Sequence, residues 1–79
     1  VKLENLETLI VGGGNVGLEK LEALIHNSPH AKITIVAPEI RQEIIELKNL
    51  YPQIHIIKSK YEPQYLESKD LVICATDDK

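Results

Sequence analysis

The sequence predicts an α/β fold, a parallel sheet of about four strands with helices on both faces. Apolar runs typical of buried strands occupy residues 8–11 and 32–36, with a segment of helical periodicity between them. Two further apolar runs, residues 54–58 and 71–75, follow along the chain. Because strands that alternate with helices join through right-handed crossovers, they are expected to form a parallel sheet.

A glycine-rich turn directly follows the first predicted strand. Gly12, Gly14 and Gly17 have the G-x-G-x-x-G spacing of a dinucleotide-binding turn. The first glycine lets the chain reverse tightly, the second lets the backbone approach a pyrophosphate, and the third lets the next helix pack closely on the strand. Backbone N–H groups and the positive end of the helix dipole would hold the phosphates. We therefore predict a Rossmann-like NAD(P)-binding domain. The alternative is a glycine turn that binds nothing.

The first predicted helix, residues 16–25, carries an apolar stripe at positions 18, 21 and 25 and ends before Pro29. With its flanking strands it forms a βαβ unit of 29 residues, from Thr8 to Val36. This length is close to the ~30 residues that such units need.

The second predicted helix covers residues 40–50, with apolar positions 40, 44 and 47 on one face. Pro38 just before it and Glu39 in its first turn suit a helix start. Residues 63–66 are expected to form one short helical turn before the fourth strand.

The strand order predicts where a ligand would bind. In the usual arrangement the first strand lies centrally, the second and third to one side, and the fourth to the other. Residues 12–17, 37–39 and 76–78 would then converge beyond the carboxyl ends of the strands. A sheet that ended on the apolar fourth strand would leave an exposed edge. We therefore expect residues 1–79 to be the N-terminal part of a single dinucleotide-binding domain within a longer protein.

Composition excludes several classes of function. The net charge of −3 comes from 12 acidic and 9 basic residues without a block of either sign, which argues against nucleic-acid binding. No apolar run approaches the ~20 residues that span a bilayer. Cys74, the single cysteine, lies in an apolar strand, so we expect a buried thiol in a reducing cytoplasm. The three histidines lack metal-ligand spacing, so no metal site is predicted.

The residue that would hold the adenosine ribose is not obvious. An acid usually stands ~20 residues after the glycines, but Val36, 19 residues after Gly17, cannot take that role. Glu39 is the only acid near enough, and it could either reach the ribose or merely stabilise the next helix. Arg41 could accept a 2′-phosphate, but we expect it to lie inside the helix and face solvent.

Two polar residues follow the fourth strand, where a nicotinamide ribose or a substrate would pass. Thr76 and Asp77 could exchange hydrogen bonds with a ligand there. They are the predicted site residues on that side of the crevice.

Three segments together resemble one family: LIVGGGNVGLEK (residues 9–20), TIVAPE (34–39) and ATDD (75–78). They are similar to the N-terminal part of siroheme synthases, and more narrowly to the precorrin-2 dehydrogenase (sirohydrochlorin ferrochelatase) module. The resemblance implies NAD-dependent oxidation of precorrin-2 to sirohydrochlorin in siroheme biosynthesis, with iron chelation at the same site in some members. It also implies a cytoplasmic homodimer that binds a tetrapyrrole.

The resemblance further implies roles for particular residues. Asn15 and Val16 would contact the pyrophosphate, while Pro38 and Glu39 would bind the ribose. The family's catalytic aspartate lies in a later segment, beyond Lys79, so no catalytic residue is expected within these 79 residues and the chain alone should be inactive.

Two observations qualify this picture. Where the family often has Ala-x-Arg-Lys, this chain has Gly17-Leu18-Glu19-Lys20, so any contact from that arginine is absent. A regulatory NAD-binding domain of a transport system would share the fold and the glycine turn. Such domains usually end the second strand with an acid, so Val36 argues against this alternative.

Overall fold

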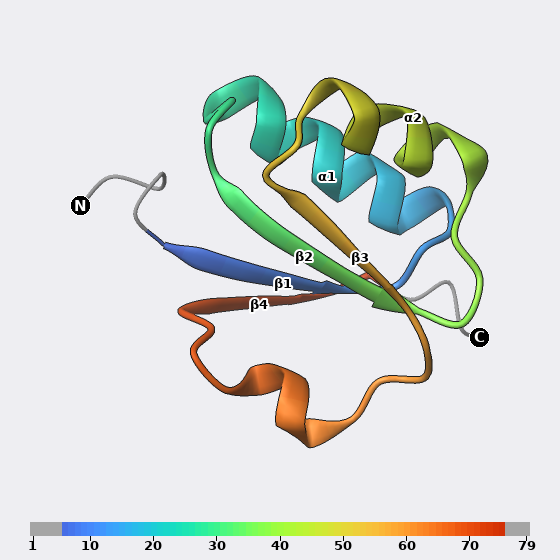
Figure 1. Cartoon of the computed structure of the whole chain (residues 1–79), viewed down its shortest axis with the longest axis vertical. Helices are drawn as coiled ribbons and strands as arrows, with labels where there is room; N and C mark the ends of the chain where they lie inside the picture. Colours follow the sequence, from blue (N-terminus) through green and yellow to red (C-terminus); the bar gives the residue numbers. More distant parts are fainter. Residues whose placement is uncertain (1–5, 76–79) are drawn as a thin grey trace.

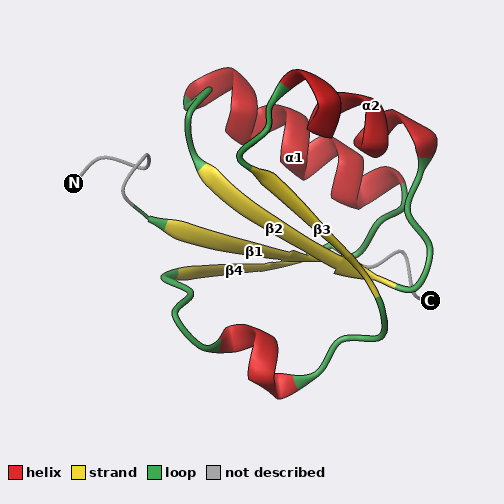
Figure 2. Cartoon of the chain, in the orientation of Figure 1, coloured by secondary structure: helices red, strands yellow, loops and turns green. Residues whose placement is uncertain are grey.

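The computed structural model describes residues 6–75. Four strands form one parallel sheet in the order β3-β2-β1-β4. Their bounds are β1 (Glu7–Val11), β2 (Lys32–Ala37), β3 (Ile54–Lys58) and β4 (Leu71–Cys74). Because all four run in the same direction, their carboxyl ends lie at one edge of the sheet (Figure 2). The predicted α/β class and strand order are confirmed.

The two α-helices, α1 (Asn15–Asn27) and α2 (Gln42–Leu50), lie on the same face of the sheet (Figure 1). The 3₁₀ helix η2 (Pro63–Leu66), on the connection between β3 and β4, lies on the other face. It occupies the residues for which a short helical turn is predicted. No helix in the described part of the chain has both the length and the hydrophobicity that crossing a bilayer requires.

The core lies between the sheet and the two α-helices. A row of isoleucines crosses the sheet, since Ile10 is paired in register with Ile35 and Ile73, and Ile35 with Ile56. The predicted helix stripes pack against this row. The buried residues of this core are Ile10, Leu21, Ile25, Ala31, Ile33, Ile35, Ile44, Ile54 and Ala75. Each fully buried Leu or Ile side chain contributes ~1.5–3 kcal/mol through removal of apolar surface from water.

Strand β4 is less covered than its apolar sequence predicts. Leu71 and Val72 are 39% and 40% exposed, and Cys74 is exposed as well. The prediction that Cys74 is a buried thiol is therefore wrong for the described residues. Within residues 6–75, β4 pairs only with β1, and an apolar run alone does not distinguish a central strand from an edge strand.

Helix α2 begins later than predicted. Its first residue is Gln42, and the preceding Arg41 has an extended backbone (φ −64°, ψ 147°). The Arg41 N–H donates to the carbonyl oxygen of Gly13 at 3.0 Å. Glu39 therefore lies in the connection before the helix, and the acid in the first turn is Glu43.

Candidate dinucleotide-binding site

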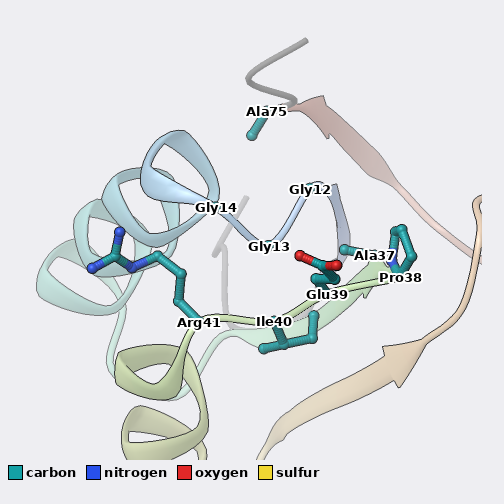
Figure 3. A pocket seen from close by; sticks show the side chains of 9 residues that line it. All are labelled: Gly12, Gly13, Gly14, Ala37, Pro38, Glu39, Ile40, Arg41 and Ala75. Atoms are coloured by element: carbon teal, nitrogen blue, oxygen red, sulfur yellow. The ribbon is translucent and has the colours of Figure 1, made fainter.

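A pocket of about 420 Å³ opens at the carboxyl edge of the sheet (Figure 3). It is formed by the turn after β1, the connection after β2 and the residue that follows β4. Its lining residues are Gly12, Gly13, Gly14, Ala37, Pro38, Glu39, Ile40, Arg41 and Ala75. The volume lies within the ~300–1,000 Å³ typical of small-molecule sites.

This pocket is where the sequence predicts that three segments converge. Residues 12–14 and 37–39 meet there as expected. Thr76 and Asp77, the predicted site residues of the third segment, lie outside the described residues. Their neighbour Ala75 lines the pocket, and its N–H donates to the carbonyl oxygen of Val11 at 2.8 Å.

Gly12 forms the turn out of β1. Its φ of 132° is a conformation that side-chain-bearing L residues rarely adopt. Its N–H still donates to the carbonyl oxygen of Val36 at 2.9 Å, so pairing with β2 continues to the point where the chain reverses.

Gly17 brings the first helix close to that turn. A Cβ at this position would lie 2.3 Å from the carbonyl oxygen of Gly12, far inside contact distance. Only glycine therefore lets α1 begin directly against the end of β1. This is the packing role expected of the third glycine of the motif.

Gly14 is the N-cap of α1 and has a different role. The residue lines the pocket, and α1 has no side-chain cap on its N-terminus. Space beside a helix start without such a cap suits a phosphate group, because the positive end of the helix dipole attracts anions. The glycine turn therefore fits the pyrophosphate of a dinucleotide.

Gly13 belongs to the site, although the motif does not call for it. Its Cβ would lie 2.4 Å from the carbonyl oxygen of Glu39 and 2.9 Å from Cδ1 of Ile40. The connection after β2 therefore packs directly on the glycine turn. The only signal in the sequence is that position 13, which the motif leaves open between Gly12 and Gly14, is also a glycine.

The connection after β2 contributes Pro38 and Glu39 to the pocket, and both are exposed. Figure 3 shows the Glu39 carboxylate beside the glycine turn. Val36, which stands near the usual position of the ribose-binding acid, is fully buried in the sheet. Of these residues, only Glu39 presents a carboxylate to the pocket.

Arg41 also lines the pocket. The expectation that it lies inside the helix is wrong, because α2 begins at Gln42, but its side chain is exposed as expected. It is the N-cap of α2, and its side chain extends toward α1 (Figure 3). Its guanidinium donates to Oδ1 of Asn15 and forms an ion pair with Glu43, with Nη2 3.0 Å from Oε2. The hydrogen bond from Arg41 holds the pKa of the Glu43 carboxyl below its usual range.

Asn15 and Val16, the other predicted pyrophosphate contacts, form the start of α1. They adjoin the pocket but are not among the residues that line it. Nowhere between residues 6 and 75 do three or more His, Cys, Asp or Glu side chains gather as a metal site would need.

A glycine turn between β1 and α1, beside a pocket where the strand order reverses between β1 and β4, defines a Rossmann-like dinucleotide-binding domain. A family model described as "Putative NAD(P)-binding" matches residues 1–79, and the chain belongs to this family.

Similar proteins carry more specific names. The siroheme synthase of Pseudoalteromonas translucida (strain TAC 125) is 42% identical over 76 residues, which are 96% of this chain and 15% of that protein. The siroheme synthase of Psychrobacter sp. (strain PRwf-1) is 43% identical over 79 residues, 99% of this chain and again 15% of the relative. The solved structure of SirC, a precorrin-2 dehydrogenase, superposes with a TM-score of 0.84 and 27% identity. The match covers 99% of this chain and 38% of SirC, so the chain spans a minor part of each protein it resembles.

Proposed function

We propose that this chain forms the cofactor-binding part of an NAD-dependent precorrin-2 dehydrogenase, which oxidises precorrin-2 to sirohydrochlorin in siroheme biosynthesis. The observation that carries this proposal is the pocket in which the glycine turn after β1 meets the connection after β2. The names of the siroheme synthases and of SirC support the choice of substrate.

In this proposal the residues of the pocket bind and orient NAD. Gly12 and Gly17 shape the turn, Gly14 leaves space for the pyrophosphate, and the first turn of α1, with Asn15 and Val16, attracts it. Pro38 and Glu39 would hold the adenosine ribose, while Thr76 and Asp77 would lie toward the nicotinamide ribose. When bound, NAD supplies the redox chemistry by accepting a hydride, and the protein supplies orientation.

Two charged residues favour NAD over its 2′-phosphorylated form. The Glu39 carboxylate lines the ribose side of the pocket and would repel a phosphate there. Arg41, the cation nearest to it among the lining residues, is engaged by Glu43. The regulatory-domain alternative is not favoured, because the last two residues of β2, Val36 and Ala37, are buried and apolar and neither is an acid.

Further parts of the proposal come from the family resemblance. We expect residues 1–79 to be the N-terminal part of the cofactor domain in a cytoplasmic homodimer. The catalytic aspartate is expected outside these residues. Size-exclusion chromatography of the full-length protein with light scattering would test the dimer.

The function is tested by calorimetric titration of the full-length protein with NAD, with NADP as the control, followed by an absorbance assay with precorrin-2. Binding of NAD and formation of sirohydrochlorin are expected. Tight NAD binding without turnover would favour a regulatory domain instead. Absence of binding by either nucleotide would exclude both functions.

A further inference from the structure

Arg41 connects the two halves of the pocket through both its backbone and its side chain. Its backbone N–H donates to the carbonyl oxygen of Gly13 at 3.0 Å, and its Nη1 donates to Oδ1 of Asn15 in the first turn of α1. These bonds link the start of α2 to the glycine turn and to the helix start that follows it. Figure 3 shows the side chain extending from α2 toward α1.

Glu43 fixes the orientation of that guanidinium. Nε of Arg41 donates to Oε1 at 3.2 Å and Nη2 donates to Oε2 at 3.0 Å, so both carboxylate oxygens face one edge of the fork. The remaining nitrogen, Nη1, is thereby directed at Asn15. A planar fork held along one edge presents its other donor in a defined direction, which a lysine ammonium does not do.

The two residues are partly exposed, with 41% and 50% of the Arg41 and Glu43 side chains accessible. An ion pair this exposed adds little to global stability. Its position is more informative than its strength, because it lies where the pocket residues of two connections meet. The hydrogen bond from Arg41 lowers the pKa of the Glu43 carboxyl, so the pair stays ionised further into acid than an ordinary carboxylate would.

We propose that Arg41 is a positioning residue for dinucleotide binding. Glu43 fixes its guanidinium, and the guanidinium, through its hydrogen bond to Asn15, holds the first turn of α1 beside the connection that carries Glu39. This inference rests on the proposed function, since it explains how the residues of the same NAD-binding pocket are held in place. Arg41 acts on the cofactor through Asn15 and not as a charge placed on a phosphate.

The test is calorimetric titration of full-length variants with NAD. Arg41→Ala is expected to weaken binding about fivefold, the effect of losing one charge-assisted hydrogen bond at a partly exposed site. Arg41→Lys is expected to weaken it similarly, because the charge is kept but the fork is lost. Lys32→Ala removes an exposed cation from the opposite end of β2 and is the matched control, with wild-type affinity expected.

A double-mutant cycle separates positioning from direct charge. If Arg41 acts through Asn15, then Arg41→Ala adds no further loss in an Asn15→Ala background. Additive losses, or wild-type affinity in Arg41→Lys, would show a direct electrostatic role and overturn the inference. Should Arg41→Ala fail to fold, the NAD affinities of Arg41→Lys and Asn15→Ala distinguish the same two roles, because equal losses in both are expected only if Arg41 acts through Asn15.

The wild-type titration distinguishes the two levels of the proposal. A wild-type protein that does not bind NAD would contradict the proposed function itself. A wild-type protein that binds NAD no better than Arg41→Ala and Arg41→Lys would contradict only the role of Arg41.

Discussion

The carbonyl oxygen of Gly12 occupies space that a side chain at Gly17 would need, only 2.3 Å from the Cβ position. Because that oxygen belongs to the backbone of the turn, either the turn or α1 must move to admit a methyl group. We expect Gly17→Ala to lower the free energy of unfolding by ~1–3 kcal/mol, the usual cost of overpacking. Urea unfolding measures this change, and an unaltered midpoint would show that the contact is easily relieved.

Gly14→Ala tests a glycine of the same turn that lines the pocket. Gly14 is the N-cap of α1, where alanine is less favourable than glycine, so we expect the free energy of unfolding to fall by ~1 kcal/mol or less. The alanine methyl group would occupy the space beside the start of α1, and NAD affinity should fall about tenfold or more. Urea unfolding and calorimetry on the same preparation test both parts. Retained NAD affinity would place the pyrophosphate elsewhere.

Asp70 holds the start of β4 against the start of β1. Its Oδ2 accepts from the Glu7 N–H at 2.9 Å, and its own N–H donates to the Glu7 carbonyl oxygen at 2.7 Å. We expect Asp70→Ala to lower the free energy of unfolding by ~1 kcal/mol, through loss of a hydrogen bond to a charged acceptor. Asp70→Asn, which keeps an acceptor oxygen, should lose less. An Asp70→Ala variant with the thermal stability of the wild type would mean that the carboxylate bond contributes nothing.

The ion pair between Arg41 and Glu43 predicts a pH dependence of stability. The hydrogen bond from Arg41 lowers the pKa of the folded Glu43 carboxyl below its ordinary value of 4.5. The contribution is therefore fully present above pH 4.5 and is lost as the pH falls through the lowered folded value. The melting-temperature advantage of the wild type over Glu43→Gln should be constant near neutrality and shrink in acid. An advantage that grows in acid would contradict this prediction, because it would mean that protonation of Glu43 stabilises the fold.

Local sequence patterns were sufficient for the strands, the first helix and the glycine turn. Apolar periodicity marks the buried face of each element. Gly12 and Gly17 stand where the turn needs a positive φ and a close helix approach, respectively. The start of α2 could not be predicted in this way. Pro38 and Glu39 resemble a helix start locally, but the hydrogen bond from Arg41 to Gly13, 28 positions earlier, keeps the chain extended until Gln42.

The site was predictable only in part for the same reason. A motif names the glycines that face a ligand, whereas Gly13 is required by packing against Glu39 and Ile40, which the motif does not describe. The side chain of Arg41 joins the pocket through a contact between two helices, and such a contact has no local signature.

Glu39 provides the sharpest functional prediction. It is the lining residue whose carboxylate could accept the ribose hydroxyls of NAD and would repel a 2′-phosphate. We expect Glu39→Gln to weaken NAD binding and to reduce the preference for NAD over NADP by about tenfold, because a neutral amide accepts less strongly and repels no phosphate. Calorimetric titration with both nucleotides measures the ratio. Glu46→Gln, which removes the same charge from an exposed position on α2, is the control and should leave the ratio unchanged. An unchanged ratio of NAD to NADP affinity in Glu39→Gln would mean that Glu39 does not contact the ribose.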